Sequence, residues 1–149
     1  RPGGERPDLE DFVQQGFIDL YDSVAESSGH GQDVVVDVGH HEAYTRPLGT
    51  LRSAARHLEG YPAWLVGVRC PLDVIMERRD AKEGSTYLGT SARGEIPEPV
   101  RRWQIEAHRP GIYDFEVDAS VLSPSECGNA ILEFIHDNQP SALQRIALE

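Results

Sequence analysis

The sequence predicts an α/β fold with a doubly wound parallel sheet and flanking helices, and three observations lead to it. A short apolar run over residues 64–69 suits a strand that is covered on both faces. Similar runs occupy residues 33–38 and 113–118. Segments with helical spacing of apolar residues separate these runs, and a helical crossover makes successive strands parallel.

Residues that start or stop helices place the helical segments. Pro71 fits the first position of a helix, and Asp73 complements the helix dipole in its first turn. Ser123 or Ser125 caps the final helix, with Glu126 nearby. We therefore expect helices over residues 8–27, 46–58, 71–79, 97–108 and from about 123 onward.

Length and composition indicate one domain over residues 1–149, because 39% hydrophobic residues suffice for one core. A net charge of -11 argues against nucleic acid as the main partner, since phosphate contacts need a basic face.

No apolar run reaches the length of a membrane span, and no signal-peptide pattern is present, so we expect a cytoplasmic protein without a membrane partner. Cys70 and Cys127 are expected to be free thiols. The polar tail over 139–149 is either an amphipathic addition or partly disordered.

Polar side chains gather where the strand over residues 33–38 ends. Asp37 lies at the carboxyl end, where open parallel sheets place functional groups. Its carboxylate either serves a site, by holding Mg²⁺ through water or orienting a substrate hydroxyl, or caps the following turn. His40 and His41 are adjacent and show no H-E-x-x-H spacing, so no zinc site is predicted. We expect them to be surface or acceptor-site polar residues.

The order of motifs along the second half of the chain is informative. The run Val66-Gly-Val-Arg-Cys70 leads into a helix that ends in Arg78 and Arg79. Arg93-Gly-Glu then leads through a helix, with Gln104 and His108 four residues apart, to a Tyr-Asp-Phe-Glu-Val-Asp strand and a Glu-Cys helix. In this order the chain resembles the chloramphenicol phosphotransferase-like family of P-loop kinases. The resemblance covers roughly residues 33–136 and is strongest over 64–131.

The resemblance implies an ATP-dependent phosphotransferase that uses Mg²⁺ and phosphorylates a hydroxyl of a small molecule. It implies a mobile lid over about residues 78–95, in which Arg79 and Arg93 neutralise the transferred phosphoryl group. The alternative for this segment is a solvated loop, with the arginine pair complementing the helix dipole. The remaining implied site residues are Asp37 and His108 for catalysis, Arg78, Asp118, Ala119 and Ser120 for the nucleotide, and Phe17, Tyr21, His40 and His41 for the acceptor. Core packing is the alternative for Phe17 and Tyr21.

One motif of P-loop kinases is missing from these residues. The sequence contains no G-x-x-x-x-G-K-[ST], whose backbone N–H groups, Lys and hydroxyl hold the phosphates and Mg²⁺, and its only lysine is Lys82 in the expected lid. In the resembled family the first strand and phosphate loop precede everything seen here, so we expect the chain to be incomplete. That strand would lie between the strands over 33–38 and 64–69, and its removal predicts a poor independent folder.

Two other classes of protein remain as alternatives. A non-catalytic, kinase-like binding protein would have lost its phosphate loop and would use its pocket or the tail over residues 143–148 for recognition. It would neither bind ATP with Mg²⁺ nor transfer phosphate. An unrelated α/β hydrolase is disfavoured, because no G-x-S-x-G elbow occurs.

Overall fold

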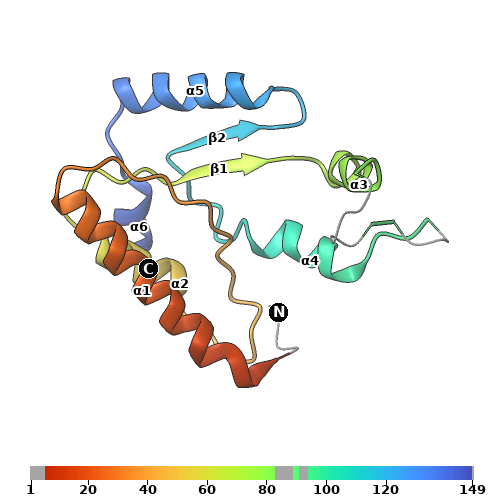
Figure 1. Ribbon diagram of the computed structural model, residues 1–149, viewed down its shortest axis with the longest axis horizontal. Helices are drawn as coiled ribbons and strands as arrows, with labels where there is room; N and C mark the ends of the chain where they lie inside the picture. Colours follow the sequence, from red (N-terminus) through yellow and green to blue (C-terminus); the bar gives the residue numbers. More distant parts are fainter. Residues whose placement is uncertain (1–5, 83–88, 91–93, 149) are drawn as a thin grey trace.

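The computed structural model describes residues 6–82, 89–90 and 94–148 (Figure 1). In these ranges two strands lie among the helices, and each strand follows a pair of helices in the chain. In chain order the elements are the short 3₁₀ helix η1 (Pro7–Leu9), α1 (Glu10–Gly29), α2 (Thr50–His57), β1 (Val66–Arg69), α3 (Leu72–Asp80), α4 (Glu98–Glu106), β2 (Phe115–Asp118), α5 (Pro124–Asp137) and α6 (Ala142–Leu148).

The sheet consists of β1 and β2, which run parallel with Val66 opposite Phe115 and Arg69 opposite Asp118. This parallel pairing confirms the prediction for these two segments. The helix α5 lies along β2 (Figure 1), and Phe115 stacks on Phe134 of α5 with ring centroids 4.6 Å apart. The fold is therefore mixed α/β, and the sheet in the described part of the chain has two strands rather than a doubly wound set.

Residues 33–38 do not form the buried strand that the apolar run predicts. The segment is extended, and the exposed fractions of Val34 and Val35 are 40% and 98%. Val36, which points the other way along an extended chain, packs against the core. The prediction fails because a strand needs a neighbour for its backbone hydrogen bonds, and no strand of the described residues pairs with this segment.

A helical block, made of α1, α2 and α6, lies on the opposite side of the sheet from α5 (Figure 1). Its core cluster contains Tyr21, Val24 and Ala54, and Phe17, Leu20 and Leu58 pack against it. Both α1 and α6 pack on α2. Phe17 and Tyr21 of the first predicted helix therefore pack in this core, which agrees with the core-packing alternative.

Local residues explain most helix boundaries. The helix α2 begins at Thr50 rather than near Arg46, because Gly49 adopts a left-handed conformation with a φ of 63° just before it. The helix α5 begins as predicted: the Ser123 side chain accepts from the Glu126 backbone, and the Glu126 side chain accepts from the Ser123 backbone. These two residues form a capping box.

The tail is part of the fold, so partial disorder is the wrong alternative for residues 142–148. Ala142 and Ile146 of α6 are buried, with exposed fractions of 0% and 4%. The Asp114 carboxylate accepts from the backbone N–H groups of Ser141 at 2.7 Å and Ala142 at 2.8 Å, which caps α6. It also accepts from the backbone N–H of Leu65 at 2.9 Å. Asp114 therefore connects the helical block to the start of the sheet.

No helix in the described ranges combines the length and apolar character that crossing a bilayer requires.

Candidate functional site

The carboxyl ends of β1 and β2 bring several predicted site residues together. The Arg78 guanidinium, from the last turn of α3, donates to the carbonyl of Ala119 at 2.6 Å and to Sγ of Cys70 at 3.7 Å. Cys70 follows β1 directly, and Ala119 follows β2. Arg78 therefore spans the two strand ends, at the edge where parallel sheets bind ligands. Both thiols, Cys70 and Cys127, are free, as predicted.

The turn after β2 is held by its own side chains. Oδ1 of Asp118 accepts from the Ser120 backbone N–H at 2.8 Å and from the Ser120 hydroxyl at 2.5 Å. The hydrogen bond from the Ser120 side chain lowers the pKa of Asp118. The backbone N–H of Ala119 donates to the carbonyl of Arg69 at 2.8 Å, which extends the ladder into the turn. The four residues predicted to bind a nucleotide are thus neighbours in a preformed turn and its adjoining helix.

The predicted lid falls largely outside the described residues, which omit 83–88 and 91–93, and with them Arg93. Arg79 lies in the last turn of α3. At the base of the segment, the Asp80 carboxylate accepts from the Thr90 backbone N–H at 2.8 Å and from the Thr90 hydroxyl at 2.5 Å. The hydroxyl contact lowers the pKa of Asp80. Residues 80 and 90 are therefore in contact.

A second group of predicted residues lies in the helical block. The imidazole of His40 is bonded through Nε2 to the hydroxyl of Tyr21 at 2.7 Å and through Nδ1 to the hydroxyl of Thr50 at 3.0 Å. Phe17 covers this ring, with centroids 4.8 Å apart. Burial lowers the pKa of His40 to about 4 and raises the pKa of Tyr21 to about 12, so both side chains are neutral at pH 7.

His41 is buried between two aromatic rings. It stacks on Tyr44 with centroids 4.0 Å apart, and it meets Trp103 of α4 in an edge-on arrangement with centroids 4.6 Å apart. Its Nδ1 accepts from the Ala43 backbone N–H at 3.1 Å, so the neutral ring carries its proton on Nε2, a buried atom without a partner among the described residues. Desolvation lowers the pKa of His41. The surface alternative is therefore wrong for His40 and His41, which are 6% and 5% exposed.

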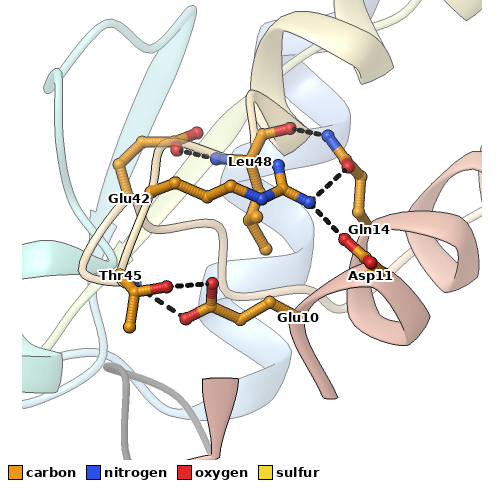
Figure 2. A network of polar contacts seen from close by, with 7 residues as sticks. Glu10, Asp11, Gln14, Glu42, Thr45 and Leu48 are labelled. Atoms are coloured by element: carbon orange, nitrogen blue, oxygen red, sulfur yellow. Dashed lines mark hydrogen bonds and ion pairs between the residues drawn. The ribbon is translucent and has the colours of Figure 1, made fainter. Parts of the chain in front are cut away.

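Carboxylates fix the backbone of the loop over residues 39–49 (Figure 2). The buried Glu10 accepts from the backbone N–H of Thr45 at 2.8 Å and from its hydroxyl at 2.5 Å. Glu42 accepts from the backbone N–H groups of Leu48 at 2.7 Å and Gly49 at 3.2 Å. Sequence reasoning missed Glu10 and Glu42, because their partners are identified only by the folded loop. The loop is consequently preorganised around His40 and His41.

Two further predicted residues lie apart from these groups. Asp37 is exposed on the extended segment, three residues before His40. Nδ1 of His108 is bonded to the hydroxyl of Tyr113 at 2.8 Å. The Tyr113 ring lies against Gly67, where a Cβ atom would approach it to 3.0 Å. His108 therefore sits beside the first half of the strands, whereas Arg78 lies at their carboxyl ends.

Metal ligation finds limited support in the described ranges. No group of three or more His, Cys, Asp or Glu residues there is arranged to hold a metal ion. Asp37 and Asp118 each present a single carboxylate. A Mg²⁺ ion at either would rely on water and substrate phosphates for its other ligands, which is the usual manner of Mg²⁺ binding.

Comparison with known proteins gives one positive finding. A family model described as chloramphenicol phosphotransferase-like protein matches residues 2–136. Searches of curated proteins and of solved structures found no match. The matched region spans α1 to α5 and so contains both groups of site residues. The chain belongs to the chloramphenicol phosphotransferase-like family.

Proposed function

We propose that the protein is an ATP-dependent phosphotransferase that transfers a phosphoryl group to a hydroxyl of a small molecule. Membership of the chloramphenicol phosphotransferase-like family is the observation that carries this proposal. The geometry supports it with two preformed groups of residues, one at the carboxyl ends of the strands and one in the loop over 39–49. We assign the first to the nucleotide and the second to the acceptor.

The nucleotide side of the site consists of Arg78 and the turn over residues 118–120. ATP with Mg²⁺ supplies the phosphoryl group and neutralises part of its charge. Arg78 donates to the Ala119 carbonyl, so the protein's own contacts hold the guanidinium against the turn. Side-chain contacts within the turn fix Asp118 and Ser120 in the same way.

The negative charge that develops on the transferred phosphoryl group must be neutralised by cationic side chains that can move to it. Phosphoryl transfer spreads negative charge over three oxygens, and arginine binds such oxygens with two parallel N–H groups. Arg79 is in the last turn of α3, next to Arg78, and Arg93 follows it in the segment that includes the predicted lid. We assign both to charge neutralisation.

The acceptor side of the site consists of the loop over residues 39–49 and the residues behind it. The Nε2–H of His41 has no partner in the described part of the chain, and once the ring is uncovered this group could donate a hydrogen bond to an oxygen of the acceptor molecule. Phe17 and Tyr21 of α1 support this loop by contacting His40 within it. Asp37 precedes it and is assigned to Mg²⁺ or to the acceptor hydroxyl. A role for His108 would use Nε2, because Nδ1 is bonded to Tyr113.

The doubly wound sheet is part of this proposal. A further parallel strand would fit between β1 and residues 33–38, because β1 pairs on one edge within the described chain and Val34 and Val35 expose apolar surface. Such a strand, followed by a phosphate loop, would supply the backbone N–H groups that phosphates need. The 149 residues contain no such loop.

The test measures nucleotide binding and phosphoryl transfer together. We expect the protein to bind ATP with Mg²⁺ in calorimetry and to form ADP when hydroxylated small molecules, chloramphenicol among them, are offered. Arg79→Ala should lower turnover by a factor of about 10³. Arg56→Ala, which alters an exposed arginine of α2, is the matched control and should leave turnover unchanged. A protein that binds no ATP would instead be a kinase-like binding protein.

A further inference from the structure

Consecutive residues of α4 contact two loops that are distant in the sequence. The Gln104 side chain donates to the carbonyl of Cys70 at 2.6 Å, at the end of β1. The Trp103 ring lies edge-on to His41, and its Cζ3 would be 3.4 Å from a Cβ atom at Gly39. Neighbouring residues of a helix project about 100° apart, so one rigid helix reaches both loops at once.

The Gln104 contact continues into the nucleotide side of the site. Cys70 accepts from Arg78 through Sγ, and Arg78 donates to the carbonyl of Ala119. Gln104, Cys70, Arg78 and Ala119 therefore form an unbroken series of contacts across the carboxyl ends of both strands. The first and last hydrogen bonds of this series are 2.6 Å long, and the contact between Arg78 and Sγ of Cys70 at 3.7 Å joins them. A displacement of Gln104 would therefore act first on Cys70 and through it on Arg78.

The Trp103 contact continues into the acceptor side. His41 is confined between Trp103 and Tyr44, and the hydrogen bonds described for this loop run to α1, to α2 and within the loop. Trp103 connects the loop to α4. It also covers the imidazole whose Nε2–H has no partner among the described residues. The position of α4 thus determines how far Trp103 covers the His41 imidazole.

We propose that Trp103 and Gln104 are positioning residues, through which α4 sets the separation between the loop over residues 39–49 and the carboxyl end of β1. The inference rests on the proposed function, since it is the transfer reaction that makes this separation matter. Phosphoryl transfer needs acceptor and donor aligned within a fraction of an ångström, and a misplacement of about 1 Å costs roughly 100-fold in rate. A single helix in contact with both sides provides that alignment.

The first experiment reads Trp103 while Gln104 is changed. The chain has two tryptophans, and Trp64→Phe makes Trp103 the only reporter. This substitution removes an indole N–H that is buried without a partner. Gln104→Met then deletes the donor to Cys70 at nearly constant volume. We expect a red shift of Trp103 emission and stronger acrylamide quenching. Ile105→Ala, at an exposed position of α4, is the control and should change neither.

The reciprocal experiment reads Cys70 while Trp103 is changed, because coupling between two sites is mutual. In a Cys127→Ala background, Trp103→Leu removes the ring that contacts His41 and Gly39. We expect a thiol reagent to modify Cys70 faster. Unchanged emission in the first experiment together with an unchanged Cys70 rate would overturn the proposal. Should Gln104→Met fail to unfold cooperatively, the Cys70 rate alone decides.

Neither the Trp103 fluorescence nor the Cys70 modification rate requires a nucleotide. The positioning role of α4 can therefore be disproved independently of the proposed function. In the transfer assay we expect Gln104→Met to lower kcat by roughly 100-fold while the KM values for ATP and acceptor change little. A loss confined to KM would show that Gln104 acts on binding and would overturn its positioning role. Coupling observed in a protein that transfers no phosphate would retain α4 as a connector and overturn its assignment to the reaction.

Discussion

The helical block and the sheet are built differently. Around the helical block, polar side chains are buried and bonded: Glu10, His40 and Thr50 are each less than 10% exposed and each has a side-chain partner. Within the described ranges the sheet has two strands of four residues, and Val68 in β1 is 56% exposed although its partner Val117 is buried. Specific contacts therefore preorganise the helical block, whereas part of the apolar surface of the sheet is exposed. The loop over residues 39–49 accordingly depends on internal hydrogen bonds, whereas the strand ends depend on the segments that cover the sheet.

The largest expected effect comes from separating the two regions at Asp114. Asp114→Ala leaves the backbone N–H groups of Leu65, Ser141 and Ala142 without their acceptor. We expect a loss of about 4 kcal/mol in the free energy of unfolding, because each orphaned N–H costs about 1–3 kcal/mol and water recovers part of it. Chemical denaturation measures this. Asp33→Ala, at an exposed position, is the control, and equal midpoints for the two variants would contradict the connecting role.

The second largest expected effect is the pH dependence of stability that buried His40 causes in the helical block. Burial lowers the pKa of His40 to about 4, so the unfolded chain binds the proton more tightly than the folded protein does. The stabilising contribution of neutral His40 is complete above about pH 6.5 and falls as the pH drops towards 4, by roughly 3 kcal/mol in total.

The measurement is the difference between the wild-type protein and His40→Gln in unfolding free energy at several pH values. The wild-type protein should lose stability more steeply between pH 6.5 and 4. His136→Gln, at an exposed histidine, should follow the wild-type curve. Parallel curves for His40→Gln and the wild-type protein would show that His40 is not held neutral by the fold.

A glycine in each region gives substitutions of opposite sign. A Cβ at Gly67 of β1 would lie 3.0 Å from the Tyr113 ring and 3.1 Å from Cγ of Glu116. Gly67→Ala should cost about 2 kcal/mol by overpacking and should disturb the bond between Tyr113 and His108. Gly16→Ala in α1 meets nothing within 4 Å and should stabilise the protein by up to about 1 kcal/mol. Thermal midpoints would reveal both, and a stabilised Gly67→Ala variant would contradict the close packing.

The smallest expected effect on stability comes from an exposed ion pair at the surface of the helical block, compared with a buried hydrogen bond in its interior. Arg46 pairs with Asp11 at 2.5 Å, but their side chains are 46% and 92% exposed. Arg46→Ala should therefore change the unfolding free energy by less than about 1 kcal/mol. Thr45→Val, which deletes the hydroxyl donor to buried Glu10, should cost more. The reverse order in denaturant titrations would mean that surface charge, and not the buried network, holds this loop.

Sequence reasoning succeeded where the signal is local. The parallel pair β1 and β2, the arginine pair at the end of α3 and the Ser123 capping box all follow from short patterns. It failed where a partner distant in the sequence decides. Residues 33–38 read as a strand, but no strand of the described chain pairs with them. His40 and His41 are polar and adjacent, yet Tyr21, Thr50 and Trp103 bury them. No spacing within the loop foretells these contacts.

The contacts of Asp114 also have a consequence for how the chain folds. Its hydrogen bonds join it to Leu65, 49 residues earlier, and to Ala142, 28 residues later. Forming them closes long loops, and the chain loses the conformational entropy of these loops before the bonds stabilise it. Because this entropy is lost before the contacts stabilise the chain, we expect the Asp114 bonds to form late in folding. We therefore expect Asp114→Ala to accelerate unfolding and to leave the refolding rate nearly unchanged, which makes this carboxylate a determinant of how long the native state persists rather than of how fast it is reached.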